Sequence, residues 1–210
     1  MSTQEAAGFW NDAVEIWLAG GWAMILLAAT ALLIFALGCS VWLRLRAKGF
    51  QSLPEETWRQ WISYPALRRG SIGELMDFVT GSRTLKDSAV VFEDLRTTEI
   101  VPFERDLRLM RICVTAAPLL GLLGTVTGML STFSALSSGS GGDETMSLVA
   151  AGISEALITT ETGLVVALAG LFFQYRLARK HEEYKAFLAH LETVWNQHIW
   201  WDQVRGRPAA

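Results

Sequence analysis

The chain has 210 residues, of which 51% are hydrophobic, and its mean hydropathy is +0.29. With nine Trp residues, this composition favours a membrane protein with a modest soluble part over an ordinary soluble domain. The net charge of −3 is small, and two cysteines are too few for a disulfide framework or a cysteine-rich metal site.

The basic residues are confined to two blocks. Residues 44–111 contain 12 of the 18 Lys and Arg, residues 176–207 contain the other 6, and neither 1–43 nor 112–175 contains any. Basic residues favour the cytoplasmic side of a membrane. We therefore expect both blocks in the cytoplasm, with the N-terminus outside and the C-terminus inside.

The first 43 residues predict two elements. In residues 1–21 apolar side chains recur at helical spacing between polar ones, which is typical of an external amphipathic helix at the membrane interface; a frayed terminus is the alternative. Residues 22–43 carry no charge, and about 20 such residues cross a hydrocarbon core of about 30 Å. No basic segment precedes this run, so we expect a retained transmembrane helix rather than a cleaved signal.

Residues 44–111 predict a cytoplasmic helical domain between the first two spans. Two pairs have the spacing of a capping box, so short helices are expected after Ser52 with Glu55 and after Ser71 with Glu74. From Leu85 the pattern becomes one helix, bent at Pro102, that continues into the second apolar segment.

Residues 112–136 predict the second transmembrane helix. At about 100° per residue, one stripe of this helix collects small and weakly polar side chains, namely Pro118, Gly121, Thr125, Gly128 and Thr132. Such stripes, together with Gly124, favour close helix packing more often than they line a pore.

The remaining residues predict a hairpin and a tail. Residues 137–147 are a polar, glycine-rich external loop, and residues 148–175 form the third transmembrane helix. Residues 176–210 keep helical spacing and are expected to extend that helix into the cytoplasm as a tail. The tail carries three histidines that we expect to be solvated: His181, His190 and His198.

The third span contains two glutamates, Glu155 and Glu161, where ionisable side chains are costly and mark ion routes or packing sites. On a helical wheel Glu155 shares its face with Gly152 and Thr159, whereas Glu161 lies about 240° away among leucines. For Glu155 we favour proton or ion handling over a neutral packing role. For Glu161 we favour a neutral packing role over proton or ion handling.

Two segments then identify a family resemblance. Residues 117–130, APLLGLLGTVTGML, and residues 152–164, GISEALITTETGL, resemble the signature stretches of the ExbB, TolQ and MotA proton-channel family, and most closely ExbB. The resemblance implies an all-α membrane protein with three transmembrane helices, the second and third long and extending into the cytoplasm. It also implies a bacterial inner-membrane stator. Because no nucleophile, base and anion-binding set converges in the sequence, we expect no enzymatic activity, and no cofactor or metal.

The resemblance assigns partners and site residues. Five copies would enclose a pore that holds two ExbD-like single-span subunits. Proton flow would act through a TonB-like protein to energise outer-membrane transport. Membrane lipid is the other expected partner, and no nucleic acid is expected. The proton path would contain Glu155, Thr125 and Thr160, with Thr159 favoured by the wheel. Two positions depart from the family: relatives often have proline near Ala169 and a small apolar residue at Glu161.

Two alternatives stay open. The output could be the TolQ type, which serves envelope maintenance; a compact domain and three spans argue against MotA. A chain of a different class would be a non-conducting scaffold that assembles membrane proteins through its small-residue helix faces.

Overall fold

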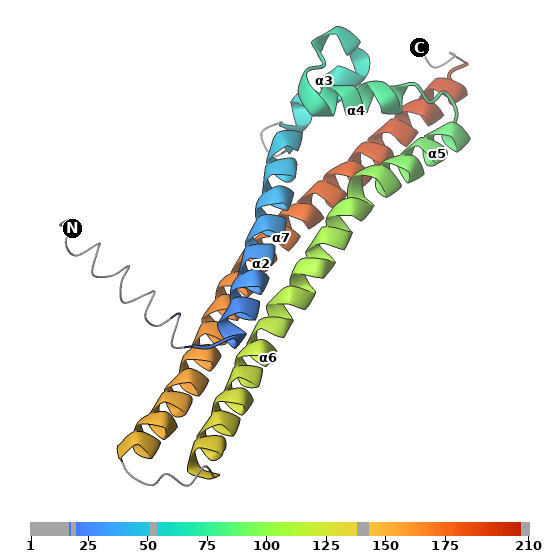
Figure 1. Cartoon of the computed structure of the whole chain (residues 1–210). Coiled ribbons are helices and arrows are strands. Elements are labelled where there is room, and N and C mark those ends of the chain that lie inside the picture. Colours follow the sequence, from blue (N-terminus) through green and yellow to red (C-terminus); the bar gives the residue numbers. More distant parts are fainter. Residues whose placement is uncertain (1–16, 18–19, 51–53, 138–142, 207–210) are drawn as a thin grey trace, which may run out of the picture. The chain divides into compact units, whose positions relative to one another are not determined.

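A computed structural model describes Trp17 and residues 20–50, 54–137 and 143–206. The described residues form helices and no strand, in the order α2 (Ala23–Lys48), α3 (Glu55–Ser63), η2 (Pro65–Leu67), α4 (Gly70–Thr80), α5 (Leu85–Leu95), η3 (Arg96–Ile100), α6 (Val101–Ser137) and α7 (Asp143–Val204) (Figure 1). Most of the predicted interfacial helix, residues 1–21, lies outside the described residues, as do residues 138–142 of the predicted external loop. Residues 143–147 of that loop are helical instead and begin α7, where the acidic Asp143 suits a helix N-terminus.

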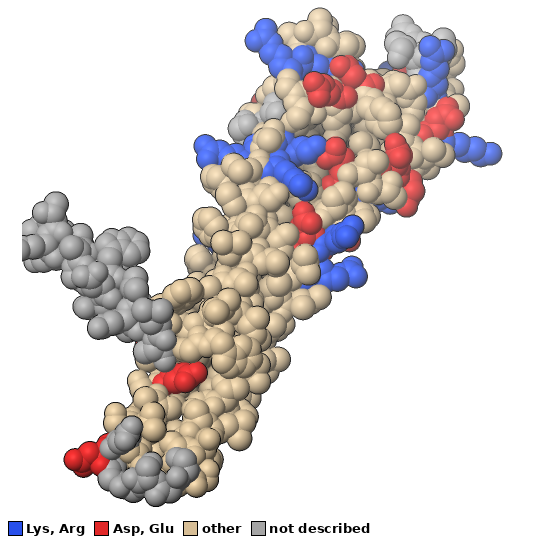
Figure 2. Space-filling model, in the orientation of Figure 1, with Lys and Arg blue, Asp and Glu red and all other residues tan. Residues whose placement is uncertain are grey.

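Three of the described helices are long and apolar enough to cross a membrane: α2, the α5–α6 helix and α7. The predicted fold class, with three apolar spans and two long helices that continue past them, is confirmed. The sidedness of the membrane stays a prediction. Along one face, Figure 2 shows a long stretch of surface without Lys or Arg, as the two basic blocks require.

The chain divides into two compact units, one of residues 1–37 and 109–174 and the other of residues 38–108 and 175–210. The first unit holds the N-terminal part of α2 with the apolar parts of α6 and α7. There α7 continues as a helix through Ala169, near which relatives often have proline. Ala169 and Gly170 line an apolar hollow of about 490 Å³ opposite Ala31 and Ile34 of α2.

In the second unit, short helices surround the last part of α7. Its core contains aromatic residues that lie far apart in the sequence: Phe50, Trp58, Phe103, Tyr184 and Trp195. The rings of Phe50 and Tyr184 lie 5.2 Å apart, and the Trp195 indole donates to the Ser82 hydroxyl at 2.8 Å. The expected helical continuation of the tail is therefore held by packing, since its apolar stripe is buried.

The short helices expected after the two capping-box pairs are present as α3 and α4, but the cap expected at Ser71 is wrong. Ser71 does not cap α4, which begins at Gly70; its hydroxyl donates instead to the carbonyls of Ala47 and Lys48, at 3.2 and 2.9 Å. Those carbonyls lie in the last turn of α2, where α-helical partners are missing. Ser52, of the other expected box, lies outside the described residues.

Where the sequence predicted a bend at Pro102, the structure has a π-helical segment before the proline. Residues Arg96–Ile100, immediately before it, are π-helical. Proline has no N–H to donate to the carbonyl four residues earlier, and its ring crowds that carbonyl. A wider preceding turn accommodates both effects, and π-bulges are a recognised source of helix irregularity.

His181 is also not solvated as expected. It is 2% exposed, because it lies on the same face of α7 as Leu177, Tyr184 and Leu188, which form the core of the second unit. Its Nε2 atom has no hydrogen-bond partner among the described residues, and the Phe103 ring lies 5.9 Å away. Burial lowers the pKa of His181 below its usual value of 6.5, and the nearby Lys185 adds to that effect.

A partly buried polar cluster lies beside His181. Lys48 forms an ion pair with Glu99 of the π-helical segment, and Glu99 accepts a weak hydrogen bond of 3.5 Å from the Tyr184 hydroxyl. Burial, and then the Glu99 carboxylate, raise the pKa of Tyr184. Glu99 thus joins the end of α2 to α7.

Candidate functional site

The predicted site residues lie along the contact between α6 and α7 in the first unit. The two helices run antiparallel, since Gly121 lies opposite Thr160 and Gly128 lies opposite Gly152. Their backbones touch: a Cβ placed on Gly121 would lie 2.9 Å from the Thr159 carbonyl oxygen, and one on Gly128 would lie 2.7 Å from that of Gly152. Small residues are required along this contact because backbone atoms cannot move aside.

The remaining predicted packing residues belong to the same contact or border it. A Cβ on Gly124 would lie 2.5 Å from the Thr159 Cβ, and one on Gly152 would lie 2.9 Å from the Gly128 carbonyl oxygen. Pro118 is half-buried inside α6, which continues as a helix on both sides of it.

The three predicted threonines occupy different positions. Thr159 is fully buried against Gly124, and its hydroxyl donates to carbonyls of its own helix. The Thr160 hydroxyl crosses the contact and donates to the Gly121 carbonyl at 3.2 Å. Thr125 is half-buried, and its hydroxyl donates to the Leu122 carbonyl at 2.6 Å. Only Thr160 therefore links the two helices by a side-chain hydrogen bond among these three.

Glu155 is half-buried and lines a hollow of about 410 Å³. The hollow lies between α6 and α7 and is lined by Ser131, Ser134, Ala135, Leu148, Ala151, Gly152 and Glu155. Its carboxyl group also lies against Gly21, in the turn before α2. The hollow is a polar niche at one flank of the α6–α7 contact.

The structure brings Glu155 together with Ser131 and Ser134, two hydroxyls that our sequence-based site omitted. Thr125 and Thr160 do not line this hollow. At about 100° per residue, Ser131 lies about 240° from Thr125 around α6, so the glycine contact separates the two. The predicted polar residues therefore divide between the two flanks of one helix pair. Serines near the end of α6 were a visible signal, but a wheel cannot show which flank faces Glu155.

Glu161 lies on another face of α7 from Glu155. It is exposed in the single chain, beside Leu157 and Leu164, which are 66% and 50% exposed. Within the described part of the chain no hydrogen bond or ion pair reaches its carboxyl group. The two glutamates thus have different surroundings, one in a hydroxyl-lined niche and one on a leucine-rich face.

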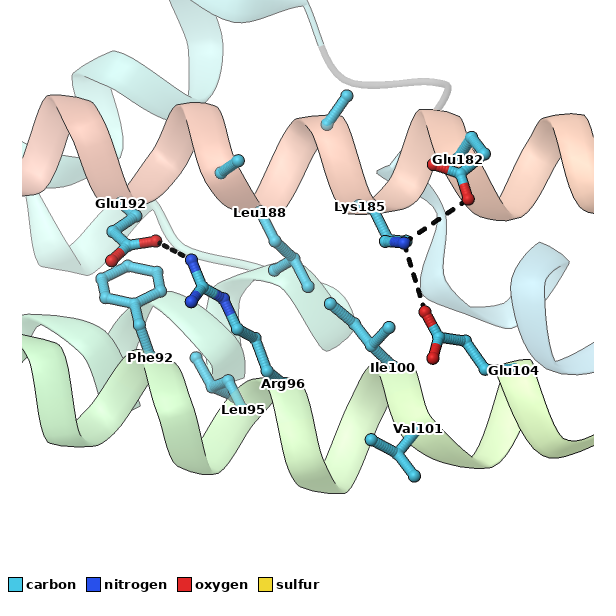
Figure 3. A pocket seen from close by; sticks show the side chains of 12 residues that line it. Phe92, Leu95, Arg96, Ile100, Val101, Glu104, Glu182, Lys185, Leu188 and Glu192 are labelled. Carbon is cyan, nitrogen blue, oxygen red and sulfur yellow. Dashed lines mark hydrogen bonds and ion pairs between the residues drawn. The ribbon is translucent and has the colours of Figure 1, made fainter.

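A groove in the second unit contains none of the predicted site residues. Its volume is about 540 Å³, and its floor is apolar (Figure 3). Two ion pairs flank it: Arg96 with Glu192 at 2.7 Å, and Lys185 with Glu104 at 3.2 Å. The Glu104 carboxylate raises the pKa of Lys185, so this amine stays charged at neutral pH. No cluster of metal-ligating side chains occurs among the described residues.

Comparison with known proteins identifies the class to which this fold and site belong. The model of the MotA/TolQ/ExbB proton channel family matches residues 79–189, which include both halves of the α6–α7 contact. The chain belongs to this family.

Several curated relatives share the same region. Putative biopolymer transport protein ExbB-like 1 of Synechocystis sp. is 37% identical over 115 residues, covering 52% of this chain and 45% of the relative. ExbB-like 3 of the same organism is 43% identical over 84 residues, 40% of either chain. Tol-Pal system protein TolQ of Haemophilus influenzae is 32% identical over 100 residues, covering 46% of this chain and 43% of TolQ. The match thus spans less than half the length of each relative.

Proposed function

We propose that this protein is a proton-conducting stator subunit of the bacterial inner membrane, with its N-terminus in the periplasm and its C-terminus in the cytoplasm. It works in a homo-oligomer, proposed to be a pentamer, around ExbD-like single-span subunits. A TonB-like protein receives the resulting movement and energises outer-membrane transport.

One observation carries this proposal: Glu155, on a helix apolar enough to cross a membrane, lines a hollow together with the hydroxyl-bearing residues Ser131 and Ser134. Ionisable side chains within a span mark ion routes by default. Ser131 and Ser134 can both donate and accept hydrogen bonds, as a proton-relay group must. We assign Glu155 the role of proton acceptor or pore counter-charge, whereas Thr125, Thr159 and Thr160 support the path from the other flank and from the contact itself. Catalytic chemistry forms no part of the proposal.

Substitution Glu155→Gln tests this role because it removes the ionisable group and nearly keeps the shape. The protein is co-expressed with its single-span partner and reconstituted into vesicles that contain a pH-sensitive dye. We expect Glu155→Gln to lose proton flux while the complex still purifies intact. Unchanged flux would rule out the proposed role of Glu155. A non-conducting scaffold would show no proton flux even without the substitution and would keep its assembling activity in Glu155→Gln.

A second output has its own support, since the chain resembles a Tol-Pal system protein as well as ExbB-like proteins. Complementation distinguishes the two outputs. Cells lacking TolQ are tested for restored envelope integrity, and cells lacking ExbB are tested for restored energised uptake. We expect the second assay to respond, whereas rescue of the first alone would assign the TolQ-type role.

A further inference from the structure

We propose that Gly21 is a positioning residue for Glu155: the turn before α2 has no side chain at this position, and its backbone sets where the Glu155 carboxyl group lies beside the hollow. This inference rests on the proposed role of Glu155. It adds the first transmembrane segment to a site otherwise built from α6 and α7.

The geometry at Gly21 leaves no space for a side chain. A Cβ placed there would fall on the Glu155 Oε1 atom and would lie 2.7 Å from Cδ and 3.4 Å from Cγ. Real Cβ atoms do not approach other atoms so closely, so the carboxyl group must move if a side chain is added. The absence of a side chain at Gly21 therefore determines where the carboxyl group lies.

The backbone of Gly21 is restricted in the same place. Its φ is +64°, a conformation that glycine adopts readily and other residues adopt at a cost. The turn is closed by hydrogen bonds from the Met24 N–H to the Gly21 carbonyl at 3.3 Å and from the Ile25 N–H to the Trp22 carbonyl at 3.1 Å. These bonds connect the turn to the first helical residues of α2, so the position of the Gly21 backbone depends on the start of that helix.

Glu155 thus meets two elements, the turn before α2 and the serine-bearing part of α6. The Gly21 turn lies against its carboxyl group, and the serine-bearing part of α6 lines the hollow that Glu155 also lines. A carboxyl group displaced from Gly21 would change its distance to the hydroxyls of Ser131 and Ser134. Misplacing a reacting group by about 1 Å can lower a rate by about a hundredfold.

The chain contains a matched control for this position. Gly49 has nearly the same φ, +66°, but a Cβ placed on it meets no atom within 4 Å. Gly21→Ala and Gly49→Ala therefore both place an alanine at a similar positive φ, and only the first displaces the Glu155 carboxyl group. A difference between the two variants that disappears when Glu155 is truncated reports on that contact.

The experiment uses the full chain with its membrane partner and has two readouts. In thermal unfolding, we expect Gly21→Ala to lower the midpoint more than Gly49→Ala, and Glu155→Ala to remove that difference because the clashing group is gone. If Gly21→Ala yields no folded protein, recovery of folding in the Gly21→Ala, Glu155→Ala double variant supports the proposal. Additive effects, or a double variant that also fails to fold, overturn it.

Proton flux is the second readout. We expect Gly21→Ala to reduce flux by about tenfold to a hundredfold, with partial recovery when the shorter Glu155→Asp is added. Flux equal to that of Gly49→Ala would overturn the positioning role. The unfolding cycle does not depend on conduction, so a failure of the proposed function and a failure of the Gly21 proposal are distinguishable.

Discussion

The Thr160 hydroxyl on α7 donates a hydrogen bond to the backbone oxygen of Gly121 on α6, at 3.2 Å. Hydrogen bonds between membrane helices contribute about 0.6 kcal/mol on average. Thr160→Val keeps the side-chain shape and removes this bond, so we expect the unfolding midpoint in detergent to fall by about 1–2 °C. Thr162→Val is the control, because the Thr162 hydroxyl bonds only to Ile158 of its own helix. An equal fall of the unfolding midpoint in Thr160→Val and Thr162→Val would contradict the stabilising role of the Thr160–Gly121 hydrogen bond.

Gly124 tests how closely the two helices must pack. A Cβ at this position would lie 2.5 Å from the Thr159 Cβ, so Gly124→Val forces the helices apart. Overpacking of this kind costs about 1–3 kcal/mol, and we expect a matching loss of thermal stability. The neighbouring substitution Leu123→Val, at a position that is 40% exposed, should change stability little. Circular dichroism during heating measures both.

Glu161 and Glu155 should respond differently to the same substitution. Glu161→Gln changes a group on an exposed leucine-rich face of α7, outside the hydroxyl-lined hollow. We therefore expect it to retain most of the proton flux that Glu155→Gln abolishes. Vesicle flux assays on both variants make the comparison, and equal losses would show that the separation of the two faces has no functional meaning.

His181 predicts a pH dependence of folding stability. Because burial lowers its pKa below 6.5, the folded state favours the neutral imidazole. The corresponding stability is complete above about pH 6.5 and is lost as the pH falls below that value, where the unfolded chain binds the proton first. Groups facing His181 are Lys185, Glu182 and Glu104.

Unfolding midpoints between pH 7.5 and about pH 5 measure this effect. We expect His181→Phe to flatten the acid part of the plot of unfolding midpoint against pH. His190→Gln changes an exposed histidine that is paired with Glu55, and it should leave the acid part of that plot unchanged. A profile unchanged by His181→Phe would assign the acid sensitivity to other groups.

Arg68 holds the short helices of the second unit together. Its side chain is 5% exposed and donates to the Trp61 carbonyl at 2.9 Å, the Asp77 carboxylate at 2.6 Å and the Thr80 hydroxyl at 2.8 Å. Hydrogen bonds to charged groups contribute about 1.5–3 kcal/mol, so we expect Arg68→Ala to destabilise this unit by about that amount. Arg69→Ala, at the adjacent exposed position, is the control in a denaturant titration.

Features that depend on local pattern could be predicted from the amino-acid sequence. Uninterrupted apolar runs predicted three spans, and helical periodicity predicted the long extension of α7 to Val204. A carboxyl group inside an apolar segment marked Glu155, because its cost requires no knowledge of the fold. The glycines of the α6–α7 contact could also be recognised from the sequence, since small residues in a span indicate close packing.

Which residues meet across helices depends on the tertiary structure. It placed Ser131, Ser134 and Gly21 beside Glu155, turned Thr125 and Thr160 to the other flank, buried His181 and used Ser71 to bond the end of α2. A helical wheel describes one helix about its own axis. The partners of a side chain depend on the height and rotation of the neighbouring helix, and those follow from packing between residues such as Gly124 and Thr159, which lie far apart in the sequence.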